Sequence, residues 1–142
     1  MKAKQLSIFL ENKVGRLAEV TCALGDEGIN IRALSLADTS DFGVLRLIVD
    51  DPNRAQKALR EEGYTVSITE VIAVEVPDKP GGLGLVLSSF TDLGVNIEYM
   101  YAFAGKNGDN AIVVFRVEDP DRAIPILRQH GVRLLKEDEI YR

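Results

Sequence analysis

ENKVGRLAEVTCALGDEGINI, at residues 11–31, and PDKPGGLGLVLSSFTDLGVNI, at residues 77–97, follow one pattern. Each places a lysine, a glycine and a leucine before an apolar stripe at helical spacing, and each ends in glycine, an apolar residue, asparagine and isoleucine. A second match joins DPNRA at residues 51–55 to DPDRA at residues 119–123. Repetition at a period of this kind indicates a duplicated structural unit.

The repeat predicts two domains, at residues 1–70 and 71–142. Each copy has the hydrophobic periodicity of a strand, a helix, two strands, a second helix and a last strand, and in the first copy the helical stripe runs from residue 17 to residue 24. Asp51 and Asp119 each precede a proline, which is typical of a helix N-cap and first turn. The βαββαβ order predicts the α+β class, with two tandem ferredoxin-like units, each an antiparallel sheet with helices on one face.

The strands that follow the first hairpins, at residues 44–49 and 111–115, are apolar on both faces with almost no alternation. One layer of helices covers only one face of a sheet, and a large apolar face is not normally left in water. We therefore expect the second face to meet the other repeat or another chain, and we expect a homodimer.

The composition bears on the partners of the chain. A net charge of −5 disfavours a broad phosphate-binding surface, and the aromatic and basic platform of an RNA-recognition module is absent, so we expect no nucleic acid. No run of eighteen apolar residues or secretory signal is evident, which predicts a cytoplasmic protein without membrane contact. One cysteine and one histidine predict neither a metal nor a cofactor. Cys22, within the first predicted helix, is expected to be buried.

No catalytic constellation stands out in the sequence. His130 precedes Gly131 at a predicted helix end, where the helix dipole explains it, and no GxxxxGK phosphate loop is present. An acylphosphatase-like enzyme on the same fold would need a phosphate loop with an arginine, and no such site is evident. We therefore expect no catalytic residues and no enzyme activity.

The turn between the first strand and the first helix carries glycine in both copies, as Gly15 and as Gly81 with Gly82. Unpaired N–H groups and the positive end of the helix dipole make such a turn a seat for a carboxylate. Asn30 and Asn96 occupy matching places before the next strand, and an amide can donate and accept at once. If one turn faced another unit's second strand, these segments would enclose a small amino acid. A purely structural role for these glycines and asparagines stays open.

Both stretches also resemble the opening of an ACT domain, whose usual pattern is an acid or Asn, Lys or Arg, Pro, Gly and Leu, with a helix that ends in Gly, an apolar residue, Asn and Ile. The resemblance covers nearly the whole chain. It implies a stand-alone tandem ACT protein, a non-catalytic regulator linked to amino-acid metabolism that binds a free amino acid at the interface between units. The ligand-binding residues that it implies are Asn12, Lys13, Val14, Gly15, Arg16, Leu17, Asn30, Ile31, Asp78, Lys79, Pro80, Gly81, Gly82, Leu83, Asn96 and Ile97.

Two departures from the family pattern predict unequal sites in the two copies. Val14 stands where the family usually has proline, and Gly82 loosens the start of the second copy's helix. The resemblance implies that any output passes through a separate metabolic enzyme. The main alternative is a regulatory subunit of a biosynthetic enzyme complex, similar to that of acetolactate synthase, whose apolar sheet faces act mainly through protein contacts.

Overall fold

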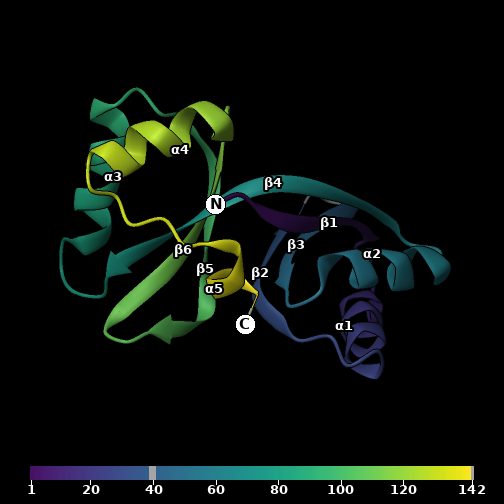
Figure 1. The fold of residues 1–142 in the computed structure, drawn as a ribbon. Helices are drawn as coiled ribbons and strands as arrows, with labels where there is room; N and C mark the ends of the chain where they lie inside the picture. Colours follow the sequence, from purple (N-terminus) through teal and green to yellow (C-terminus); the bar gives the residue numbers. More distant parts are fainter. Residues whose placement is uncertain (39–40, 142) are drawn as a thin grey trace. The chain divides into compact units, whose positions relative to one another are not determined.

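The computed structural model describes residues 1–38 and 41–141 and divides them into two compact units (Figure 1). Lys4–Thr69 and Tyr141 form what we call the N-terminal unit. Met1–Ala3 and Glu70–Ile140 form the C-terminal unit. The first three residues of the chain therefore pack with its second half.

The N-terminal unit has β3 between β1 and β2, antiparallel to both, with Leu47 opposite both Leu6 and Leu34. One face of this sheet packs on the two helices, because the apolar stripe of each helix and alternate residues of the strands meet in one core. Its elements are β1 (Ala3–Glu11), α1 (Arg16–Asp26), β2 (Ile31–Asp38), β3 (Phe42–Val49), α2 (Pro52–Glu61) and the first residues of β4 (Thr65–Pro77). The core includes Leu6, Ile8, Leu45, Leu47, Val20, Leu24, Ala55 and Leu59.

The C-terminal unit repeats this plan, with β6 between β4 and β5 and antiparallel to both. Phe90 of the first helix packs on Phe115 of the central strand, with ring centroids 4.8 Å apart. The elements are the rest of β4, α3 (Gly82–Asp92), β5 (Ile97–Asn107), β6 (Asn110–Val117), α4 (Pro120–Gln129) and α5 (Glu137–Ile140). The predicted class of two βαββαβ units with helices on one face of each sheet is confirmed.

The last strand predicted for the second copy is reduced to a single bridge. Leu134 pairs antiparallel with Val74, and the N–H of Leu135 donates to the carbonyl of Ala73. The chain then turns into the short α5, where the N–H of Lys136 donates to the side chain of Glu139. A local cap thus competes with further pairing along the sheet.

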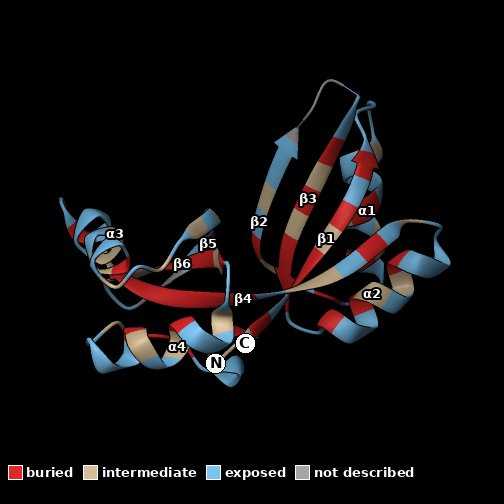
Figure 2. Ribbon diagram, turned by 90° about the horizontal axis from the view of Figure 1, so that it is seen from above, coloured by how far each residue is buried: buried red, intermediate tan, exposed pale blue. Residues whose placement is uncertain are grey.

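Cys22 is exposed, so the expectation of a buried cysteine was wrong. Val20 and Leu24, the buried residues of α1, lie two positions to either side of it. At about 100° per residue a neighbour two positions away points to the other side of a helix. The outward faces of the helices are correspondingly exposed (Figure 2).

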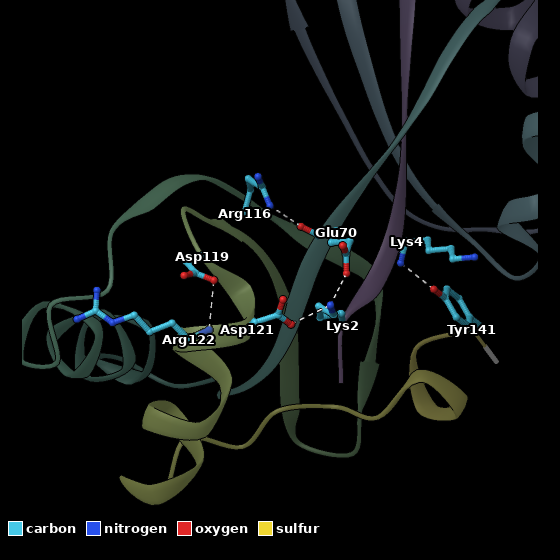
Figure 3. A network of polar contacts seen from close by, with 8 residues as sticks. All are labelled: Lys2, Lys4, Glu70, Arg116, Asp119, Asp121, Arg122 and Tyr141. Carbon is cyan, nitrogen blue, oxygen red and sulfur yellow. Dashed lines mark hydrogen bonds and ion pairs between the residues drawn. The ribbon is translucent and has the colours of Figure 1, made fainter.

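The N-terminal residues join the C-terminal unit through a charged contact. Lys2 Nζ lies 2.7 Å from a carboxylate oxygen of Glu70 and 2.8 Å from one of Asp121 (Figure 3). Hydrogen bonds to Asp121 and then Glu70 raise the pKa of Lys2. Within the N-terminal unit, the backbone N–H of Lys4 donates to the hydroxyl of Tyr141 at 2.7 Å. Among the described residues, no helix is long and apolar enough to cross a membrane.

Candidate ligand-binding site

The glycine turns that were predicted to bind a carboxylate lie at the start of a helix in both units. Gly15 is the N-cap of α1 with a φ of 90°, and Gly81 is the N-cap of α3 with a φ of 82°, a left-handed conformation that favours glycine. Because the N-cap residue is glycine, neither helix has a capping hydrogen bond from the side chain of its N-cap. In α1 the N–H of Arg16 donates to the Lys13 carbonyl, and the N–H of Glu19 donates to Gly15. The two N–H groups between these need an acceptor from outside the helix.

Both cations of the first turn have carboxylate neighbours. Lys13 Nζ lies 2.8 Å from Glu11 and lowers the pKa of that carboxyl. Arg16 Nη1 lies 3.1 Å from Glu19, to which the Tyr64 hydroxyl also donates at 3.0 Å. The bond from Tyr64, followed by that from Arg16, lowers the pKa of Glu19. Backbone N–H groups of the first turn of α1 are thus available to an anion beside these paired side chains.

A hollow of about 60 Å³ lies against the first turn. This volume holds a few water molecules, much less than an amino acid occupies. Val14, at the tip of the turn, is fully exposed. The hollow gathers four of the predicted residues with their neighbours, and its lining consists of Leu10, Glu11, Asn12, Lys13, Arg16, Leu17, Leu36 and Gly43.

The second turn, from Asp78 to Leu83, differs at its glycine pair. Asp78, Lys79, Pro80 and Gly81 are exposed, but Gly82 is buried. A Cβ at Gly82 would lie 2.0 Å from the carbonyl oxygen of Pro77, so glycine is needed here for close packing. Gly82 was predicted to loosen this helix start. In the structure its backbone packs closely against Pro77, the last residue of β4.

Asn30 and the first turn lie at opposite ends of the N-terminal sheet. Ile31, which follows Asn30, pairs with Val49 at the end of β3, whereas Glu11, before the turn, pairs with Phe42 at its beginning. The eight residues of β2 separate the two ends by roughly 25 Å. One unit therefore cannot place its own turn and its own asparagine around one small ligand.

The C-terminal unit has the same separation. Ile97, after Asn96, pairs with Val117, whereas Pro77, before the turn, pairs with Asn110 at the other end of β6. Any site that contains both features must take the turn from one unit and the asparagine from another.

Asn96 lines a hollow of about 400 Å³ where β5 begins and α4 begins. The same hollow includes Arg122, whose backbone N–H donates to the Asp119 side chain at 3.3 Å (Figure 3). Sequence reasoning did not select Arg122, although the repeated DPNRA and DPDRA place it in the position matching Arg54. No group of three or more potential metal ligands occurs in the described parts of the chain.

The model of the ACT domain pair matches residues 1–142. The chain belongs to this family. The match confirms the resemblance found in residues 11–31 and 77–97, and ACT domains are regulatory, non-catalytic units. No curated protein matches this ACT domain pair.

Among solved structures, a Bacteroides thetaiotaomicron protein is 48% identical to this ACT domain pair, with a TM-score of 0.93 over 100% of this chain and 97% of that chain. The regulatory subunit of aspartate kinase from Thermus thermophilus, in a ligand-free form, shares the fold at 18% identity, with a TM-score of 0.65 over 90% and 92%. The corresponding Thermus flavus subunit is 19% identical, with a TM-score of 0.58 over 89% and 90%.

Proposed function

We propose that this ACT domain pair is a non-catalytic sensor that binds a free amino acid between a helix start of one unit and the asparagine of another. The observation that carries the proposal is the pair of glycine helix starts without side-chain caps, at Gly15 and Gly81. A helix start of this kind presents N–H groups and a positive dipole end to an anion. The α-carboxylate of the amino acid would take this place.

The position of the asparagines supports a site that is shared between units. Asn30 is exposed, and its backbone is fixed on both sides, because its N–H donates to Asp50 at 3.0 Å and its carbonyl accepts the N–H of Asp50 at 3.1 Å. The side-chain amide is thus presented from a fixed backbone to whatever faces this end of the sheet. An amide can accept from the ammonium group and donate to the carboxylate of an amino acid.

A shared site explains how binding could regulate. A ligand shifts an equilibrium between arrangements of units only through its different affinity for them. An amino acid that touches two units binds the arrangement that brings them together and not the one that separates them. We propose a homodimer as the assembly that responds, in the cytoplasm and within amino-acid metabolism.

The output of the sensor would go to a separate enzyme. The Thermus proteins that share its fold over nine-tenths of both chains are regulatory subunits of aspartate kinase. This supports a partner enzyme without naming it.

A melting-temperature screen against the twenty amino acids tests the proposal. A ligand at 100 times its dissociation constant adds about 2.7 kcal/mol to stability, which is a shift of several degrees for a chain of this size. Asn30→Ala and Asn96→Ala should reduce the shift without lowering the melting temperature of the free protein. Gln129→Ala, an exposed amide at the end of α4, is the matched control. No shift with any amino acid would refute the sensor and favour a subunit that acts through protein contacts alone.

A further inference from the structure

The two units carry equivalent hollows with different chemistry. In the N-terminal unit a hollow of about 420 Å³ lies beside the end of β1, the first turns of α1 and the turn after α2. In the C-terminal unit a hollow of about 470 Å³ lies at the matching place, beside the end of β4, α3 and the turn after α4. We call them the Phe9 hollow and the Arg133 hollow after one lining residue of each.

The two hollows are similar in volume and position, but most of their lining residues differ. Phe9 and Phe42, which stack at 4.9 Å in the first hollow, correspond by the repeat to Glu75 and Asn110 in the second. Of the residues in the turn after the second helix, only the glycine is retained. The full correspondence replaces Phe9, Glu11, Arg16, Glu19, Phe42, Glu62, Tyr64 and Thr65 by Glu75, Pro77, Gly82, Leu85, Asn110, His130, Val132 and Arg133.

The Arg133 hollow contains a buried charge that packing does not require. The Glu75 side chain is 4% exposed; it lies 2.7 Å from Arg133 Nε and accepts the Asn110 amide at 3.3 Å. A buried ion pair is often no more stabilising than apolar residues of similar volume, and Phe9 fills the matching place in the other unit. What the pair does achieve is to fix the guanidinium. The backbone of Arg133 is held as well, because the backbone N–H of Glu75 donates to the Arg133 carbonyl at 3.0 Å.

The geometry points to a binding site for a small monocarboxylate with an apolar body. The contact with Glu75 uses Nε, and the two terminal nitrogens of a guanidinium can together hold a carboxylate. The Arg133 side chain is 69% exposed and is therefore accessible to a ligand. Leu85 and Val86 provide an apolar wall in the same hollow, and Leu85 is 71% exposed.

The same residues select against a free amino acid. Among the described residues that line the hollow, Glu75 alone carries a carboxylate, and Arg133 and Asn110 already hold it. An ammonium group would therefore enter without a counter-charge. His130 also lines the hollow, and its Nδ1 lies 2.9 Å from the carbonyl oxygen of Ile126. The Phe9 hollow has more acidic than basic residues in its lining, because Glu11, Glu19 and Glu62 stand against Arg16.

Titration with sodium 4-methylpentanoate, followed by amide chemical shifts, tests the site. We expect shifts confined to residues 75–77, 82–89, 110 and 130–133, which line the hollow or lie between its lining residues. Binding of 4-methylpentanamide, which has the same shape without the charge, should be at least tenfold weaker. Arg133→Gln should weaken binding of the carboxylate by about tenfold or more, since it removes the fork of donors. Arg128→Gln removes the same charge from an exposed position outside the hollow and should bind as the natural protein does.

A second variant keeps the test decisive if Arg133→Gln unfolds because it leaves Glu75 without its partner. Leu85→Glu changes an exposed position and places a negative charge on the apolar wall, so it should weaken binding while the protein stays folded. Shifts at the start of α1, unchanged binding in Leu85→Glu, or no shifts in the natural protein would each overturn the proposal. Asn30→Ala should leave this binding unaltered, which separates the outcome from that of the amino-acid screen.

Discussion

Two glycines of α3 that are two residues apart should respond in opposite directions to the same substitution. Gly82 is buried at the first position of the helix, and a Cβ there would lie 2.0 Å from the Pro77 carbonyl oxygen. That carbonyl is held in place by the N–H of Lys79 at 2.9 Å, so it cannot move away freely. At Gly84, also helical, a Cβ would meet nothing within 4 Å.

We expect Gly82→Ala to lower the free energy of unfolding by about 1–3 kcal/mol, the usual range for overpacking. Gly84→Ala should raise it by ~0.5–1 kcal/mol, because alanine loses less backbone entropy in a helix than glycine. At about 3 °C per kcal/mol, the two variants should melt several degrees apart.

Calorimetry measures the difference, and hydrogen exchange shows where it arises. Exchange in Gly82→Ala should rise in α3 and the end of β4 and stay unchanged in α1, because only the C-terminal unit is altered. Equal melting temperatures for the two variants would refute the account of Gly82 as a packing residue. Arg16, the counterpart of Gly82 in the first repeat, shows that the other unit leaves room for a side chain there.

The free energy of unfolding should fall by about 1 kcal/mol in Asp51→Ala and in Asp119→Ala, because each aspartate side chain accepts a hydrogen bond from a backbone N–H at the start of its helix. Urea unfolding measures this loss. Tyr64→Phe should raise the pKa of Glu19, measured by NMR titration, because the hydroxyl is the main cause of its lowering. Because the pKa of Glu19 in the folded protein lies below its ordinary value of 4.5, the ionised side chain stabilises the fold above that pH, and this stabilisation is lost as the pH falls through the pKa of the folded state. The difference in melting temperature between the natural protein and Glu19→Gln should therefore close in acid. Deletion of residues 1–3 should speed hydrogen exchange in residues 70–77 more than in α1, since Lys2 joins Glu70 and Asp121; equal effects in both would contradict this placement.

The repeat made the fold predictable, because duplicated helix stripes and capped helix starts mark the same elements twice. Asp51 and Asp119 show this most directly, since each caps its helix as its sequence position predicts. The single bridge at Leu134 was not predictable, because local capping after Gly131 competes with strand pairing and hydrophobic pattern does not decide between them. Predicting that Cys22 is exposed required knowing which side of α1 faces the core, and not only that the residue lies in a helix.

The candidate site was predictable only in its separate parts. Gly15 and Gly81 were found because both copies carry glycine in the turn before the first helix, and both adopt the left-handed conformation that favours glycine. That Asn30 lies at the opposite end of the sheet from its own turn depends on β3 lying between β1 and β2, which is a tertiary property. The ion pair of Glu75 and Arg133 could not be predicted from the sequence either, because the two residues are far apart along the chain and meet only in the folded unit.

A crystal structure with the amino acid that gives the largest melting shift tests the shared site most directly. We expect the α-carboxylate within hydrogen-bonding distance of N–H groups at the start of α1 or α3, with Asn30 or Asn96 of a different unit on its other side. An amino acid bound within one unit, away from both helix starts, would contradict it.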